Sequence, residues 1–409
     1  MTANNQVRTY GTTNPLLTAS YSGFINGDGT NVLTGAPALS TSAGVASPMG
    51  NYTIMASQGT LGATNYSFQF VNGTLTVNPA SLTVSAKNAN KTYGQTVTFA
   101  GTEFTSSGLV NGDTVSSVTL ASSGAVATAG VAGSPYAINV TNATGGGLAN
   151  YTISYQAGTL TVNPAALTVS AKNTNKVYGQ TITFAGTEFT SSNLLNGDTV
   201  SSVSLASSGA AATAGVAGSP YAINATNAIG GGLANYIISY RPGTLTVNPP
   251  ALTVSADDKT RMYGSTNPML TASYNGFTNN ETTNVLYGSP ALSTTANPNS
   301  LVGNYPITIT QGTLSSANYT FTFTNGTLTV TSAPAPMILS VGLINQVITV
   351  TWSSIAGVPY GLQYTTNLMD PNWNIVASNV MATGPITSQT NAVGNAPLQF
   401  YRITLPQGP

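Results

Sequence analysis

A period of 85 residues organises most of this chain. The dipeptide Asn-Pro recurs at that spacing at Asn78, Asn163 and Asn248, and the dipeptide Tyr-Gly recurs at Tyr93, Tyr178 and Tyr263. A fourth Tyr-Gly begins at Tyr10, 83 residues before Tyr93. Self-similarity at a fixed period predicts stacked units rather than one globule. We therefore predict four tandem modules over residues 1–80, 81–165, 166–250 and 251–332.

The sequence at each module boundary predicts two short strands joined by proline. In residues 158–162, Gly-Thr-Leu-Thr-Val, apolar residues alternate with threonine, as in a half-buried strand. Leu160 and Val162 are therefore predicted to face a core. The pattern resumes in residues 167–170 after Pro164, which stiffens the joint and cannot donate to a ladder. The chain is predicted to be mostly β, an elongated row of beads with stiff joints.

Within module two the same alternation predicts further strands. They cover residues 82–86, 97–104, 115–120, 136–140 and 151–155. The last of them is predicted to turn, as a hairpin or a bent strand, into residues 159–162. Residues 107–113 are the one plausible helical turn.

The repeat ends in a Pro- and Ala-rich linker over residues 331–336. The strand patterns that follow, at residues 347–352, 360–364 and 400–404, are short and include Trp352. Short strands around a core tryptophan predict that residues 337–409 form a C-terminal β-sandwich.

Composition excludes several classes of function. The chain has no cysteine and no histidine, which excludes disulfides, thiolate chemistry, histidine-based triads and nearly all transition-metal sites. Charged residues make up 4% of the chain, and nine basic residues balance nine acidic ones, so nucleic acid is not an expected partner. No apolar run reaches the length of a membrane-spanning helix, and residues 1–6 do not resemble a signal peptide.

Module one is predicted to be incomplete. The other modules open with Leu-Thr-Val-Ser-Ala, whereas Val7 is the one strand candidate in residues 1–9. Two explanations stay open, and we favour the first. Either the chain is part of a longer protein, or the first sheet lacks a strand and exposes a groove that pairs with another chain. The second explanation predicts self-association through module one.

The repeated sequence motifs resemble those of a known family. Module one contains Tyr10-Gly11, Asn14-Pro15, Gly50-Asn51-Tyr52 and Gly73 to Val77, and module four contains the same motifs from Tyr263 onward. Together, the modules resemble the MBG domain of the YGX type, found in bacterial surface and secreted adhesin-like proteins. Modules two and three depart from it where Gln95-Thr96 and Gln180-Thr181 replace the Asn-Pro that follows Tyr-Gly.

The resemblance implies a β-grasp-like or otherwise β-rich module that brings no catalytic residues. Residues 337–409 resemble a fibronectin-III-like or immunoglobulin-like domain through Thr351-Trp352 and Phe400-Tyr401-Arg402.

The acid of a recurring Asn-Gly-Asp sequence is the candidate metal ligand. A carboxylate beside backbone carbonyls suits Ca²⁺, and the candidates are Asp28, Asp113 and Asp198. Each module offers one acid at this place, and Glu103 or Glu188 is the sole near companion in two of them, so we favour a plain turn.

A basic residue precedes each Tyr-Gly by two positions. It is Lys91 or Lys176 in modules two and three, and Arg8 or Arg261 in modules one and four. A Lys–Asn isopeptide bond is one hypothesis. Arginine cannot form that bond, so we favour a retained positive charge whose stem covers apolar surface.

Two further candidates concern tyrosines and acids. A sugar-binding aromatic platform has the candidates Tyr52, Tyr151, Tyr236 and Tyr305, although tyrosine at period two favours a core role. Asp257 and Asp258 are adjacent, and neighbours on a strand point to opposite faces, so they predict no acid–base pair. We predict no catalytic residue, no enzymatic activity and no cofactor.

The sequence therefore favours a non-catalytic extracellular or cell-surface repeat protein, a stalk or adhesion segment of a bacterial surface or secreted protein. Glycans and host or matrix proteins are the candidate partners. The alternatives are a carbohydrate-binding or spacer region of a secreted enzyme, and a subunit of a self-assembling extracellular filament.

Overall fold

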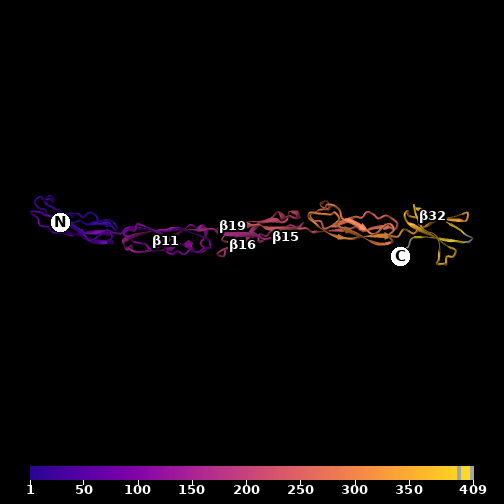
Figure 1. Cartoon of the computed structure of the whole chain (residues 1–409), viewed down its shortest axis with the longest axis horizontal. Coiled ribbons are helices and arrows are strands. Elements are labelled where there is room, and N and C mark those ends of the chain that lie inside the picture. The colour runs from indigo at the N-terminus through magenta and orange to yellow at the C-terminus, as the bar shows by residue number, and fades with distance from the viewer. Residues whose placement is uncertain (394–397, 406–409) are drawn as a thin grey trace. The chain divides into compact units, whose positions relative to one another are not determined.

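The structure is a computed structural model that describes residues 1–393 and 398–405 (Figure 1). The predicted C-terminal domain includes residues 394–397 and 406–409, which lie outside the described residues. The described chain is almost all β: it has short 3-10 turns and no α-helix. No helix within the described ranges has the length and apolar character needed to cross a membrane.

The chain divides into two compact units. The first holds residues 1–170, 186–204 and 225–241, and the second holds residues 171–185, 205–224 and 242–409. Module three contributes to both units.

Module two shows the plan of the repeat. In one sheet β7 lies between β12, parallel to it, and β9, antiparallel. In the other sheet β13 lies between β8, which is parallel to it, and β11, which is antiparallel to it. Strand β10 pairs with β11 and forms the edge of that sheet. The elements are β7 (Ala80–Ala86), β8 (Ala89–Thr92), β9 (Phe104–Ser107), β10 (Ser117–Ala121), η2 (Ser123–Ala125), η3 (Val131–Gly133), β11 (Tyr136–Thr144), η4 (Leu148–Asn150), β12 (Tyr151–Gln156) and β13 (Gly158–Asn163).

Alternation of side chains builds the core of this module. Leu82 and Val84 on β7 are fully buried, as are Ile138 on β11 and Leu160 on β13. The threonines between them face outward or lie at the rim, as period two requires. Thr-Leu-Thr-Val thus specifies which face of each strand is packed.

Modules three and four repeat the plan. The elements of module three are β14 (Ala165–Ala171), β15 (Thr174–Val177), β16 (Phe189–Ser192), β17 (Ser202–Ala206), η5 (Ser208–Ala210), η6 (Val216–Gly218), β18 (Tyr221–Ile229), η7 (Leu233–Asn235), β19 (Tyr236–Arg241) and β20 (Gly243–Asn248). Those of module four are β21 (Ala251–Ala256), β22 (Lys259–Met262), β23 (Ala272–Asn275), η8 (Thr283–Val285), β24 (Ala291–Thr294), β25 (Gly303–Thr310), β26 (Thr320–Thr324) and β27 (Gly326–Thr331).

Module one keeps the four-stranded sheet and lacks most of the other. Its first strand is two residues long and pairs with β3. Residues 67–71, which correspond to β26 of module four, form no strand, and Val71 alone makes an isolated bridge to Thr2. The elements are β1 (Thr2–Ala3), β2 (Gln6–Thr9), β3 (Ala19–Ser20), η1 (Thr30–Val32), β4 (Ala38–Thr41), β5 (Gly50–Ser57) and β6 (Gly73–Asn78).

The described residues of the C-terminal part form two three-stranded antiparallel sheets. Their shared core contains Val350 and Trp352 from β29 and Tyr360 and Leu362 from β30. Ala333 of the predicted linker is buried in the same core. The strands are β28 (Ile338–Ile344), β29 (Val347–Ser353), β30 (Pro359–Thr365), β31 (Asn374–Met381), β32 (Ile386–Ala392) and β33 (Phe400–Thr404).

The strand predicted over residues 97–104 is wrong except at its end. The carboxylate of Glu103 accepts hydrogen bonds from the amides of Ala100, Gly101 and Thr102, each at 3.0 Å. Those amides are therefore not free for a ladder. The same bonds, with that of Ala100 foremost, lower the pKa of Glu103 below its usual value.

The predicted helical turn is wrong, and so is the hairpin alternative for residues 151–162. Strands β12 and β13 belong to different sheets and run parallel to β7 and β8 in turn, as the bent-strand alternative requires. Gly158 lets the chain pass close to the backbone of Ala86. Residues 107–113 cannot form a right-handed helix, because Asn111 and Gly112 have φ values of 56° and 80°. They form a turn closed by the amide of Asp113 and the carbonyl of Val110.

Candidate functional site: the joints between modules

The repeated Tyr-Gly contacts the following module. The hydroxyl of Tyr93, in module two, donates to Oδ2 of Asp198 in module three at 2.9 Å. Tyr236 of module three donates to the same oxygen at 2.8 Å. The two tyrosine rings meet edge to face with centroids 5.6 Å apart. One carboxylate thus joins a tyrosine from each side of the joint.

The arrangement recurs at the two other joints between modules. Asp113 accepts from Tyr10 at 3.0 Å and from Tyr151 at 2.9 Å. In module four a glutamate replaces the aspartate, and Glu281 accepts from Tyr178 at 2.7 Å and from Tyr319 at 2.5 Å. The ring pairs are again edge to face, at 5.6 and 5.8 Å. The first two joints lie within the first compact unit and the third within the second.

Asparagine carboxamides add a second set of contacts across each joint. Between modules two and three, Asn196 donates to the carbonyl of Ala127 at 3.0 Å, and Asn235 accepts from the amide of Val131 at 2.9 Å. Equivalent bonds cross the other joints from Asn111, Asn150, Asn279 and Asn318. Backbone groups of one module are therefore satisfied by side chains of the next.

The glycine of Tyr-Gly is required by space and by backbone conformation. Gly94 has a φ of 88°, and a Cβ there would lie 2.5 Å from Cδ1 of Leu195 in module three. At Gly11 the same test places a Cβ 2.4 Å from Val110. An L-residue at either place would be strained and would push the next module away.

Burial in the joints raises the pKa of four tyrosines. Desolvation, with a further contribution from the hydrogen bond to Asp198, raises the pKa of Tyr236 to about 12. The same causes raise the pKa of Tyr151, where the acid is Asp113, and of Tyr178 and Tyr319, where it is Glu281. Each joint thus contains at least one tyrosine whose neutral form is favoured.

Within modules one to three the two repeated dipeptides, Tyr-Gly and Asn-Pro, meet. The amide of Tyr93 donates to the carbonyl of Asn163 at 2.8 Å, and the amide of Tyr178 donates to that of Asn248 at 2.9 Å. The strand that leads into the next module is therefore bonded directly to the tyrosine that docks on it.

The basic residue before Tyr-Gly is buried in its own module. Nζ of Lys91 donates to the carbonyls of Gln95, at 2.9 Å, and Val126. Nη2 of Arg8 donates to the carbonyl of Gly44 at 2.5 Å. Lys176 and Arg261 make corresponding bonds. The cation therefore holds a loop beside the joint in place through these hydrogen bonds. Desolvation lowers the pKa of Lys91 and Lys176.

The Asn-Gly-Asp sequence forms a turn in module one, which is the interpretation that the sequence analysis favoured. Asn26 and Gly27 have positive φ, and the amide of Asp28 donates to the carbonyl of Ile25. Asp28 accepts the hydroxyl of Tyr66 at 2.7 Å, while Asp113 and Asp198 bind the joint tyrosines. In the described part of the chain no three His, Cys, Asp or Glu residues gather as a metal would require. Calcium binding at these acids stays a prediction.

The tyrosines proposed as a sugar platform divide into two pairs. Tyr151 and Tyr236 are buried in the joints. Tyr52 and Tyr305 donate to the carbonyls of Pro48 and Leu301 within their own modules.

The two adjacent acids bind different parts of their module. Asp257 accepts hydrogen bonds from the hydroxyls of Thr271 and Ser273, and Asp258 accepts one from the amide of Thr327.

Sequence reasoning missed the tyrosine–acid–tyrosine contact. Its signal was present, because Tyr-Gly, the acid after Asn-Gly or Asn-Asn, and Asn-Tyr each recur at intervals of 83 or 85 residues. The fourth Tyr-Gly differs, since Tyr263 packs on the C-terminal core and a Cβ on Gly264 would lie 2.9 Å from Val358.

Comparison with known proteins agrees with the repeat. No curated protein matches the chain. The MBG domain (YGX type) matches residues 1–76, 82–161, 167–246 and 252–329. With most of its length matched in four tandem copies, the chain belongs to the MBG domain (YGX type) family.

Proposed function

We propose that this chain is a non-catalytic spacer, the stalk segment of a bacterial surface or secreted protein. The observation that carries the proposal is the joint, in which a tyrosine, an acid and a second tyrosine fix each module to the next at three successive places. Hydrogen bonds and ring contacts across a joint oppose swivelling, which suits a segment that holds its ends apart. MBG repeats are a non-catalytic domain type, which agrees with this role.

An extracellular location of the protein agrees with its composition. With 4% charged residues and no cysteine, the surface depends on hydroxyl and amide groups for hydration. The six C-terminal strands, in sheets ordered β28-β29-β32 and β31-β30-β33 around Trp352, support a fibronectin-III-like or immunoglobulin-like end to the spacer.

Distance measurement between spin labels tests the spacer role. Because the chain lacks cysteine, labels attach only where cysteine is introduced. Ser106→Cys in module two and Ser191→Cys in module three lie on exposed positions of β9 and β16. A rigid joint gives one narrow distance distribution, as narrow as that of the pair Ser106→Cys and Ser154→Cys within module two.

Two results would contradict the spacer. One is a distribution across the joint that is broad from the start and does not change when Tyr93→Ala and Asp198→Ala remove the joint contacts. The other is selective binding of the full chain on a glycan array, which would favour an adhesive role instead.

A further inference from the structure

An asparagine that donates across the joint between modules two and three lies in a tight turn. Nδ2 of Asn196 donates to the carbonyl of Ala127 at 3.0 Å. Asn196 and Gly197 have φ values of 54° and 82°, and the amide of Asp198 closes the turn on the carbonyl of Leu195. Positive φ at both central residues defines a type I′ turn, which asparagine followed by glycine favours.

Asparagine followed by glycine is also a chemically reactive pair. The backbone nitrogen of the glycine attacks Cγ of the asparagine side chain, so that a bond from nitrogen to Cγ forms and the bond from Cγ to Nδ2 breaks. The amide proton leaves with Nδ2 as ammonia, and the product is a cyclic succinimide. Water then opens the ring at either carbonyl and gives aspartate or isoaspartate. Glycine favours the attack because it places no Cβ beside the attacking nitrogen.

The attacking nitrogen is free at the first two joints. Gly112 and Gly197 are exposed, with open space where a Cβ would lie. Within the described residues no hydrogen bond engages the amide of either glycine. The carboxamide of Asn196, in contrast, is fixed on Ala127 of the neighbouring module. Attack on Cγ therefore requires that this contact across the joint first opens.

The third joint has the same turn without the reactive pair. Nδ2 of Asn279 donates to the carbonyl of Ala212 at 3.2 Å, and the amide of Glu281 closes the turn. Its second central residue is Asn280, with a φ of 58°, in place of glycine. The side chain of Asn280 lies beside the nitrogen that would attack, so this joint should resist the reaction.

Conversion of Asn196 would weaken its joint permanently. A carboxylate has no proton to donate, so the carbonyl of Ala127 would lose its partner. The new negative charge would also lie two residues from Asp198, whose carboxylate already binds Tyr93 and Tyr236. An isoaspartate would in addition lengthen the backbone of the turn.

We propose that Asn111 and Asn196 are sites of spontaneous deamidation, which makes opening of the first two joints irreversible and leaves the third joint intact. The modification depends on the contacts within the joints and not on the spacer role.

Peptide mapping by mass spectrometry, on the full chain during long incubation, tests the proposal. Two asparagines of the same chain are controls. Asn279 has the joint contact without glycine. Asn325-Gly326 has the glycine without the turn, because Gly326 pairs with Ile307 in a ladder and Oδ1 of Asn325 accepts from the amide of Ile309 at 3.1 Å. Asn196 should convert at least about tenfold faster than either control.

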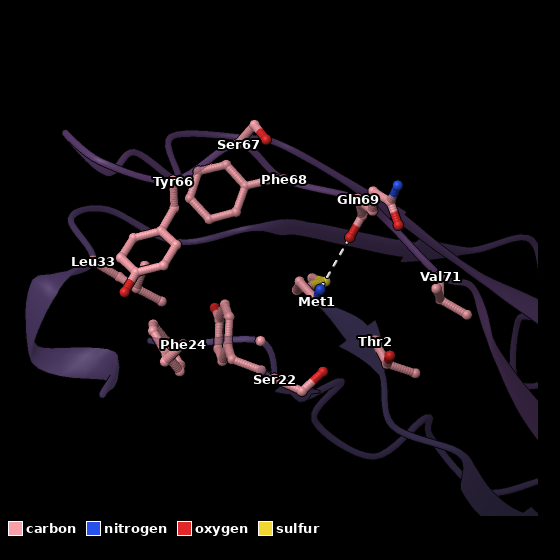
Figure 2. A pocket seen from close by; sticks show the side chains of 12 residues that line it. Met1, Thr2, Ser22, Phe24, Leu33, Tyr66, Ser67, Phe68, Gln69 and Val71 are labelled. Atoms are coloured by element: carbon pink, nitrogen blue, oxygen red, sulfur yellow. Dashed lines mark hydrogen bonds between the residues drawn. The ribbon is translucent and has the colours of Figure 1, made fainter. Parts of the chain in front are cut away.

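Module one supplies a reference turn. Asn26 and Gly27 have φ values of 57° and 82°, and within the described residues no hydrogen bond engages the carboxamide of Asn26. The turn lies beside the open pocket in Figure 2, where Tyr66 donates to Asp28. Tyr93→Phe removes one hydrogen bond from the joint of Asn196. It should speed conversion of Asn196 about fivefold and leave the rate at Asn26 unchanged.

A stability measurement links the modification to the joint. Calorimetry should show a lower unfolding temperature for the incubated chain than for the fresh chain. Gly197→Ala should slow conversion of Asn196 at least about tenfold, because it adds a Cβ beside the attacking nitrogen. The proposal is overturned if Asn196 converts no faster than Asn325, if Tyr93→Phe leaves its rate unchanged, or if the converted chain unfolds at the temperature of the fresh one.

Discussion

The hydroxyl of Tyr93 donates to the carboxylate of Asp198 across 105 residues of sequence and one module boundary. Tyr93 is 4% exposed, so its hydroxyl depends on this partner rather than on water. A tyrosine that ends one module is thus completed by the next, and the stability of neighbouring modules is coupled through it.

Removing this hydroxyl should weaken the joint. Tyr93→Phe should lower the stability of modules two and three by about 1 to 2 kcal/mol, because a hydrogen bond to a charged group is lost. Scanning calorimetry measures the change. Tyr52→Phe, whose hydroxyl bonds the carbonyl of Pro48 four residues away, is the control and should have a smaller effect. Equal effects would show that Tyr93 does not couple modules.

The glycine of Tyr-Gly should tolerate no side chain. Gly94→Ala adds the strain of a positive φ, about 1 kcal/mol, to the overlap with Leu195. Gly112→Ala is a matched control, since Gly112 has a φ of 80° and open space at Cβ. Denaturant unfolding should show a larger loss for Gly94→Ala, and Leu195→Ala should recover part of it. No difference between the glycines would rule out the close approach.

High pH should open the joint between modules two and three. The folded pKa of Tyr236 is about 12, against about 10 for an unfolded tyrosine. A raised pKa favours the neutral form, so this stabilisation is complete below pH 10 and is lost as the pH rises through the folded pKa. Absorbance at 295 nm should show a late class of tyrosines that coincides with loss of structure. Tyr236→Phe should remove part of that class, and titration of all tyrosines in one step would contradict the prediction.

The buried lysine should be replaceable by arginine alone. Lys91→Met leaves the carbonyls of Gln95 and Val126 without their donor and should cost about 2 kcal/mol in chemical denaturation. Lys91→Arg should keep most of the stability, because Arg8 and Arg261 bind loop carbonyls in their own modules. Lys87→Met, on an exposed side chain, is the control and should stay within about 0.5 kcal/mol of the parent. A neutral Lys91→Met would show that the cation is dispensable.

Much of the fold was predictable from the sequence. Alternation placed Leu160, Val162 and their repeats in the core, because a period of two leaves one face of a strand buried. It failed at residues 97–104, where the Glu103 side chain, invisible to a hydropathy pattern, takes the amides that a ladder would use. Between β12 and β13 alternation left a hairpin and a bent strand open, because adjacency along the chain does not decide which sheet a strand joins, and the structure has the bent strand.

The joints were less predictable than the strands. The recurrence of Tyr93, Asp198 and Tyr236 was visible, but a period cannot show that these residues meet across a module boundary. The hydrogen-bond partners of the buried cation were likewise not predictable from the sequence pattern. Lys91 was expected to cover apolar surface with its stem, whereas its ammonium group is enclosed and binds two loop carbonyls.

A single proline separates β6 from β7, and another separates β13 from β14. Inward and outward positions shift by one residue at each of these prolines, because the buried positions are odd-numbered on β6 and even-numbered on β7, and the reverse holds for β13 and β14. Recombination between the near-identical copies would preserve that order only when it adds or removes a whole period. The reach of such a molecule would change in discrete steps during evolution, each gained copy arriving with both of its connections already formed.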